Sequence, residues 1–251
     1  MGNVSERRKQ PPQVGVSVVI LALGPVPQSD VGAGAASSGM GSTLWMPLVK
    51  RVRQPFLGQW ALPGGGLRAD HSLEQSAYAA LESTTSLHPK YLEQLYTFGD
   101  PARSHGGLPM VSIVYWALVG EADGRIDFAG GDNVKWFPVN HLPELAFDHR
   151  TIVEYAMNRL RGKIESPDIA TRLVGERFTL SQLHDVYEAI AGQRIDLANF
   201  RRKMLASGLL EDTGEKLRIG RLPVQPEAGN GFVDRSRNGI RIGRHSNCFP
   251  G

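Results

Sequence analysis

The sequence predicts an α/β protein of two domains, an N-terminal α/β/α sandwich followed by a C-terminal winged helix-turn-helix. Apolar, β-branched runs flank one amphipathic helical pattern and precede a second, which is typical of a layered α/β domain. From Phe178 the pattern changes to two short helices followed by short apolar runs, the order of a winged helix. The 251 residues also reach the size, roughly 200 to 250 residues, at which a single core usually stops growing.

The first domain begins with runs of apolar and β-branched residues. These runs predict buried strands over Val14–Leu23, Thr43–Arg51 and Pro109–Gly120. A short strand over residues 134–139 and a helix over Phe147–Leu160 follow. We therefore expect a sheet with helices packed on it.

Composition indicates where the ordered domains end. Residues 25–42 are mostly Gly, Ala, Ser and Pro, which cannot bury enough apolar surface to become ordered. Residues 162–168, GKIESPD, are typical of a linker. We expect a disordered N-terminus over 1–13, the sandwich over 14–162, the winged helix over 163–235 and a basic tail over 236–251.

The second domain carries helix signals at both of its helices. Thr179 and Gln182 have the spacing of a capping box, and Gly192 supplies a stop for that helix. Asp196 can cap the next helix, whose apolar stripe consists of Leu197, Phe200 and Met204. Residues 208–222 contain two apolar runs around Asp-Thr-Gly, which predicts a hairpin.

The overall composition excludes several classes of protein. With 41% hydrophobic and 21% charged residues, the chain has the balance of a globular protein. No apolar run approaches the ~20 residues that span a bilayer, and the N-terminus lacks the apolar segment of a secretory signal. Cys248 is the only cysteine, so it cannot form an intramolecular disulfide. We expect a cytosolic protein without a membrane role.

The second helix of the second domain offers polar side chains to a partner. With Phe200 and Met204 inward, a helical wheel at about 100° per residue turns Asn199 and Arg202 outward, with Arg201 and Lys203 on the flanks. Arg and Asn can read base edges, and flanking cations suit phosphates. The alternative is a surface helix that carries Arg for solubility.

A basic region follows this helix. Seven Lys or Arg residues lie between Lys216 and Arg244, against Glu227 and Asp234. Charge alone favours a solvated surface or a disordered end, but the position of these residues beside a helix-turn-helix favours DNA. The residues predicted to contact double-stranded DNA are Asn199, Arg201, Arg202, Lys203, Lys216 and Arg218.

Residues 61–87, ALPGGGLRADHSLEQSAYAALESTTSL, combine a glycine-rich turn with a capped amphipathic helix. This stretch resembles the Nudix family, whose box reads G-x5-E-x7-R-E-U-x-E-E-x-G-U, with U an aliphatic residue. The box glycine falls on Gly65, and the aliphatic positions fall on Leu81 and Leu87. The spacing of the Nudix box is therefore preserved along its whole length.

The residues that give the box its function in the family are absent from this sequence. His71 stands where the first Glu belongs, and Ala79-Ala80, Ser83-Thr84 and Ser86 replace Arg-Glu, Glu-Glu and the last Gly. In the family, those carboxylates hold divalent metal ions against a pyrophosphate. Neutral hydroxyls cannot supply that charge, so we expect no metal ligands and no catalytic residues. Glu82 points about 100° away from position 83.

The whole pattern, a degenerate Nudix box joined to FTLSQLHDVYEAIAGQRIDLANFRRKMLASGLLEDTGE, resembles the Nudix-related transcriptional regulator (NrtR) family from about Val14 to Arg221. The resemblance implies a homodimer that binds a palindromic operator, controls genes of NAD metabolism and senses ADP-ribose or a related nucleotide. It also implies the effector-binding residues, which are Arg51, Phe56, Trp60, Gly64, Gly65 and Arg103.

Alternatives remain at this point. Phe56 and Trp60 could belong to the core, and Arg103 could be a solvated loop residue. The protein could be an active ADP-ribose pyrophosphatase with unusual metal ligands. The helical domain could instead bind RNA or another protein. We expect a repressor that ADP-ribose releases from its operator, because a site that binds but does not cleave its ligand suits a sensor.

Overall fold

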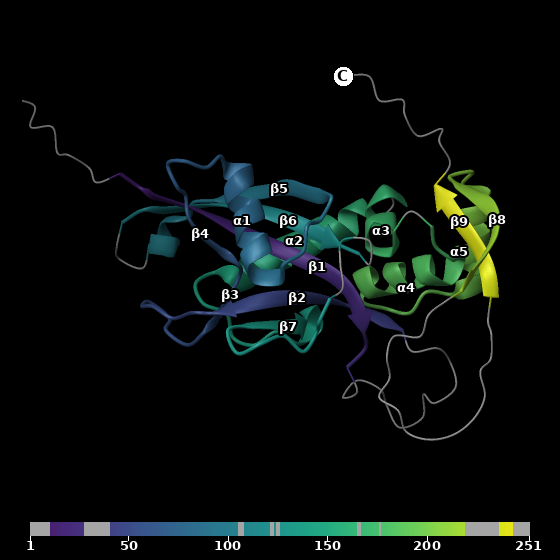
Figure 1. The fold of residues 1–251 in the computed structure, drawn as a ribbon, viewed down its shortest axis with the longest axis horizontal. Coiled ribbons are helices and arrows are strands. Elements are labelled where there is room, and N and C mark those ends of the chain that lie inside the picture. The colour runs from purple at the N-terminus through teal and green to yellow at the C-terminus, as the bar shows by residue number, and fades with distance from the viewer. Residues whose placement is uncertain are drawn as a thin grey trace, which may run out of the picture.

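The computed structural model describes residues 11–27, 41–104, 108–120, 123, 126–164, 167–175, 177–218 and 236–242. It confirms an α/β/α sandwich followed by a winged helix (Figure 1). The strands of the first domain are β1 (Gln13–Pro25), β2 (Ser42–Lys50), β3 (Trp60–Ala61), β4 (Gly64–Gly66), β5 (Tyr91–Phe98), β6 (Met110–Val119) and β7 (Val134–Pro138). Residues 1–10 and 28–40, in the predicted disordered N-terminus and loop, lie outside the described part.

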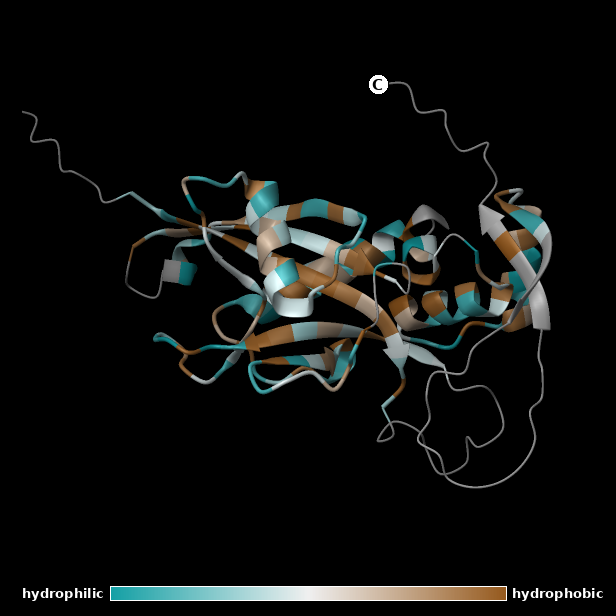
Figure 2. Ribbon diagram, viewed as in Figure 1, coloured by the Kyte–Doolittle hydropathy of each residue, from teal (hydrophilic) through white to brown (hydrophobic). Residues whose placement is uncertain are grey.

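The sheet is mixed, with strand order β3-β2-β1-β6-β5. Strand β1 pairs in parallel with β6 and antiparallel with β2, while β4 also pairs with β1 and β7 with β2. Almost every residue from Val16 to Ala22 is fully buried, so β1 is covered on both faces. Figure 2 shows this continuous hydrophobic run along β1.

The alternation of side chains along β1 builds two cores. Val19 and Leu21 lie in one cluster, whereas Val18 and Ile20 lie in the other, because successive side chains of a strand point to opposite faces. Helix α1 (Leu73–Thr85) covers the second cluster through Ala77 and Leu81. Helix α2 (His149–Lys163) covers the first through its buried residues, which include Ile152, Val153, Ala156 and Leu160.

The predicted helix signals are present. Ser72 and Gln75 form the capping box of α1, and Thr179 and Gln182 form that of α4 (Leu180–Ala191). Gly192 ends α4 in the left-handed conformation with φ 70°. Asp196 caps α5 (Leu197–Ala206) by accepting from the Asn199 N–H.

Several elements differ from the sequence prediction. The predicted hairpin over residues 208–222 is wrong: β8 (Leu210–Arg218) is one strand with an irregularity, and it pairs antiparallel with β9 (Ser236–Ile242). The wing therefore extends past residue 235, into the segment predicted to be a tail. Residues 243–251 lie outside the described part. Strand β5 and helix α3 (Pro167–Val174) were not predicted.

The two domains share one hydrophobic core. A single cluster joins β1, β2 and β6 to Leu160 of α2, Ile169 of α3, Leu183 of α4 and Phe200 of α5. The linker predicted over 162–168 thus shortens to the few residues between α2 and α3. Shared packing of this kind lets a change in one domain reach the other. Among the described residues, no helix combines the length and apolar composition that crossing a bilayer requires.

Candidate effector site and DNA-binding helix

Two predicted effector residues, Arg51 and Phe56, meet at Phe147. The guanidinium carbon of Arg51 lies 4.5 Å from the centroid of the Phe147 ring, and the Phe56 ring lies 4.8 Å from it. Phe56 (φ 66°) and Phe147 (φ 56°) both adopt the left-handed region. Such backbone costs about 1 to 3 kcal/mol per residue and clusters at binding sites. Phe147 thus joins Arg51 and Phe56 as a candidate contact for the effector.

Arg103 is the most informative of the predicted residues. It lies in the short helix η2 (Pro101–Ser104) and is only 7% exposed. Its Nη2 donates to the Ser112 hydroxyl at 2.9 Å and lies 3.3 Å from Asp148 Oδ1, without the geometry of a hydrogen bond to that oxygen. Its Nε and Nη1 are buried and have no hydrogen-bond partner among the described residues.

Unpaired donors on a buried guanidinium are costly, because each buried N–H without a partner costs about 1 to 3 kcal/mol. Burial also lowers the pKa of Arg103, against the opposing effect of Asp148. An anionic ligand would satisfy both free donors, and a phosphate suits the planar guanidinium. Arg103 is therefore a candidate for binding a phosphate or diphosphate group.

His149 lies next to the Arg103–Asp148 pair and is uncharged. Its Nδ1 accepts from the Leu62 N–H at 2.9 Å, so the ring holds the turn after β3. Burial, followed by the charges of Arg103 and Arg51, lowers the pKa of His149 to about 3. Asp148 and His149 were missed because, in sequence, they resemble ordinary residues at the start of a helix.

The lowered pKa of His149 predicts a pH-dependent stability. Between about pH 3 and pH 6.5 the unfolded chain binds a proton that the folded chain does not, so the free energy of unfolding falls as the pH falls through this window. The loss is at most about 1.4 kcal/mol per pH unit. Urea unfolding at pH 7 and pH 5 measures it. In His149→Asn, which keeps an acceptor for Leu62, the difference between the two pH values should shrink; an unchanged difference would contradict this.

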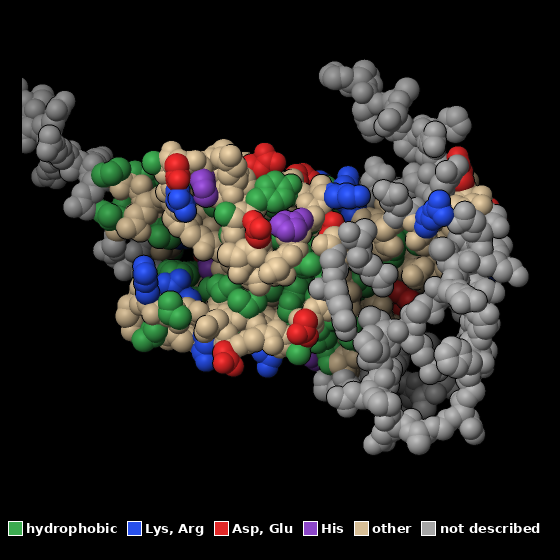
Figure 3. Space-filling model, viewed as in Figure 1, with side chains coloured by type: hydrophobic (Ala, Val, Ile, Leu, Met, Phe, Trp, Pro, Cys, Tyr) green, Lys and Arg blue, Asp and Glu red, His purple; other side chains and the backbone are tan. Residues whose placement is uncertain are grey.

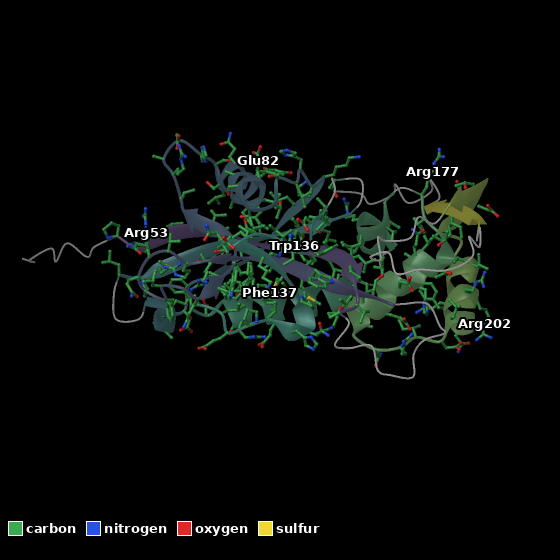
Figure 4. All side chains as sticks on the ribbon, turned by 60° about the horizontal axis from the view of Figure 1, so that its bottom comes forward. Arg53, Glu82, Trp136, Phe137, Arg177 and Arg202 are labelled. Carbon is green, nitrogen blue, oxygen red and sulfur yellow. The ribbon has the colours of Figure 1, made fainter. Side chains whose placement is uncertain are left out.

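The other predicted effector residues, Trp60, Gly64 and Gly65, have structural roles in the packing around the turn. The Trp60 ring packs edge-on against Phe137 at 5.1 Å, and Phe137, labelled in Figure 4, lies on β7, which pairs with β2 at the edge of the sheet. A Cβ on Gly64 would clash with the Val16 carbonyl oxygen, whereas one on Gly65 would meet open space. Gly64 is thus needed for the close approach of β4 to β1, while Gly65 leaves room beside the turn.

The helix that would hold metal in a Nudix hydrolase carries hydroxyls that are already bonded. Ser83 Oγ and Thr84 Oγ1 both donate to the Ala80 carbonyl, at 3.0 and 2.7 Å. Glu82 is exposed, and Figure 4 shows it on the outer side of α1. This face of α1 therefore provides no carboxylate for a divalent ion. A pocket of about 200 Å³ at the end of α1 is lined by Thr84, Thr85 and Trp136 among others, and by none of the predicted effector residues.

Within the described residues, His184, Asp185 and Glu188 of α4 could in principle hold a metal ion. Two of them are used by the turn that follows α4. His184 Nε2 lies 2.8 Å from the Ile195 carbonyl oxygen, and Glu188 Oε1 accepts from the Ile195 N–H at 2.9 Å. These two contacts favour a structural role over a metal site: His184 and Glu188 hold the turn between α4 and α5 in place.

Helix α5 presents the predicted DNA-reading face. Asn199, Arg201, Arg202 and Lys203 are all exposed, and Arg202 Nη2 donates to Asn199 Oδ1 at 2.6 Å. This bond fixes the two side chains relative to each other before any partner binds. Figure 4 shows Arg202 at the end of the molecule opposite Arg53.

The wing and the neighbouring loops complete this end of the molecule. Lys216 and Arg218 lie on β8, but their side chains are outside the described part. Arg177 and Arg194 are exposed beside the helices and were missed, because no helical period marks a loop residue. On the face shown in Figure 3, hydrophobic side chains gather along the middle of the first domain, and Lys and Arg side chains are scattered around them.

A Nudix-type sandwich whose box helix carries Ala80, Ser83 and Thr84 in place of carboxylates, joined to a winged helix with an exposed Arg- and Asn-bearing face, defines a two-domain Nudix and winged-helix protein. Residues 33–156 match the NUDIX domain, and residues 170–222 match the NrtR DNA-binding winged helix domain. The chain belongs to the NrtR family.

The chain is similar to the following three proteins. The ADPR responsive transcriptional repressor NtrR of Acinetobacter baylyi is 31% identical over 71% of this chain and 72% of its own. The crystal structure of Shewanella oneidensis NrtR with a 27mer DNA is 32% identical, covers 92% of this chain and 93% of its own, and has a TM-score of 0.66. An ADP-ribose pyrophosphatase of Methanocaldococcus jannaschii is 33% identical over 46% of this chain and 67% of its own.

Proposed function

We propose that this protein is a transcriptional repressor that binds ADP-ribose beside Arg103, leaves it intact and then releases its operator DNA. The observation that carries the proposal is the pair of free, buried donors of Arg103, on a chain that also presents Asn199 and Arg202 on α5. One chain thus combines a site suited to a diphosphate with a helix suited to the major groove.

The relatives support both halves of this proposal. The Acinetobacter baylyi relative is an ADPR-responsive repressor by name, and the Shewanella oneidensis relative was crystallised with DNA. A gel-shift titration on the DNA upstream of NAD-metabolism genes from the same genome tests the proposal. Complex should form without ADP-ribose and disappear as ADP-ribose is added; a complex that persists at saturating ADP-ribose would refute ligand-induced release.

A homodimer and a palindromic operator are further parts of the proposal. A symmetric dimer would place its two α5 helices in half-sites about one or two helical turns apart. Protection of two such half-sites in a footprint, with a two-fold sequence, is the expected result. Protection of a single half-site would indicate a monomer on DNA.

The second candidate function is an ADP-ribose pyrophosphatase, which the Methanocaldococcus jannaschii relative favours. The hydroxyls of Ser83 and Thr84, bonded back to Ala80, favour a protein that does not hydrolyse its ligand. We therefore expect no AMP above the buffer blank when the protein is incubated with ADP-ribose and Mg²⁺ or Mn²⁺. Metal-dependent AMP release, abolished when the metal is chelated, would establish the enzyme instead.

A further inference from the structure

The two ends of α2 contact the two functional regions. At its first turn, Asp148 and His149 adjoin Arg103 and Leu62. In its last turn, Arg161 donates from Nε to the Ile190 carbonyl of α4 at 3.2 Å. We propose that α2 passes effector occupancy from Arg103 to the DNA-binding helices, with Arg161 as the positioning residue at the junction. This inference rests on the proposed function and concerns its regulation.

The first step is a competition at the start of α2. Asp148 is the N-cap residue of α2, yet its side chain makes no capping hydrogen bond and instead pairs with Arg103 at 3.3 Å. An anion bound to Arg103 would compete with this carboxylate and repel it. The freed Asp148 could then cap its own helix, as Asp at an N-cap ordinarily does. Ligand binding would thus change how α2 is held.

The second step is transmission along the helix. A helix of 15 residues is about 22 Å long at 1.5 Å per residue, and its hydrogen bonds make it move as a unit. The buried side chains of Ile152, Ala156 and Leu160 keep it against the shared core. A packed element of this kind transmits a shift instead of absorbing it.

The third step is the junction with α4. The Ile190 carbonyl lies in the last turn of α4, where a cation is favoured by the helix dipole. Arg161 is held there also by Nη1, 3.3 Å from Asn158 Oδ1. Lys163 anchors the same end of α2 to β5 through Glu93, at 2.9 Å. The end of α4 is therefore tied to α2 by a directed contact.

The last step leads to the DNA-reading helix. Two residues beyond Ile190 the chain leaves α4, and the turn is clamped at Ile195 by His184 and Glu188. Asp196, the next residue, caps α5. A displacement of the end of α4 therefore changes the position of α5, and with it the fit to DNA.

The test is the effect of ADP-ribose on operator affinity in Arg161→Met, which removes the donor and keeps much of the aliphatic stem. The control is Arg159→Met, an equal charge change at an exposed position of the same helix. Allosteric coupling is typically about 5- to 150-fold. We expect native protein and R159M to lose operator affinity within that range, and R161M to lose less than twofold, while all three bind ADP-ribose equally by calorimetry.

Each other outcome overturns the inference. If R161M responds to ADP-ribose as R159M does, α2 does not act through Arg161. If R161M has lost operator affinity without ADP-ribose, Arg161 serves only to hold the winged helix together. If native protein binds ADP-ribose without losing operator affinity, the proposed function fails, and there is no coupling for α2 to carry.

Discussion

Arg103→Gln is expected to weaken ADP-ribose binding by about 2 to 3 kcal/mol, or roughly 30- to 150-fold, because hydrogen bonds to charged groups contribute about 1.5 to 3 kcal/mol. Arg103 is 7% exposed and has two donors without a partner among the described residues. A ligand phosphate that accepts from these donors would lose its strongest contact in the variant. Isothermal titration calorimetry measures the change.

The partner of Arg103 supplies the matched control. In Asp148→Asn the guanidinium keeps its charge but loses its competing carboxylate, which lies 3.3 Å away in the native protein. We expect this variant to bind ADP-ribose at least as tightly as the native protein. Equal affinity of R103Q and native protein for ADP-ribose would place the ligand elsewhere.

The second large effect is expected at α5, where Arg202→Ala and Asn199→Ala should each cost about 1 to 3 kcal/mol of operator affinity. The two changes should not add, because Arg202 Nη2 donates to Asn199 Oδ1 at 2.6 Å. Residues in direct contact ordinarily show interaction energies of about 0.5 to 3 kcal/mol. A double-mutant cycle by fluorescence anisotropy at fixed salt measures the coupling.

Arg159→Ala is the charge control for this cycle, since it removes one exposed cation from α2 and leaves α5 intact. It should alter operator affinity by much less than Arg202→Ala. If Arg202→Ala and Asn199→Ala both leave operator affinity at the native value, α5 is not the reading helix. Protein or RNA partners would then become the better explanation for the exposed face.

The sequence predicted those elements whose signal is local. The capping boxes at Ser72 and Thr179, the stop at Gly192 and the cap at Asp196 depend on residues within one helical turn of each other. The central strand β1 was equally clear, because a strand buried on both faces is a continuous apolar run. The absence of carboxylates along one face of α1 could also be derived from helical spacing alone.

Features that depend on distant contacts could not be predicted. Strand β9 pairs with β8 across a long separation in sequence, so the hairpin signal at Asp-Thr-Gly was misleading. The pairing of Arg103 with Asp148 and the hydrogen bond of Leu62 to His149 also join separate elements. A pattern in one segment contains no information on which buried group another segment brings to it.

The central claim is that bound ADP-ribose remains intact and releases DNA. The most direct measurement titrates ADP-ribose into the protein–operator complex with Mg²⁺ present, then recovers the nucleotide by chromatography and removes it from the protein by dialysis. The account predicts loss of the complex, full recovery of ADP-ribose without AMP, and return of operator binding after dialysis. Loss of the complex that requires conversion of ADP-ribose to AMP, or a complex that ADP-ribose leaves unchanged, would contradict it.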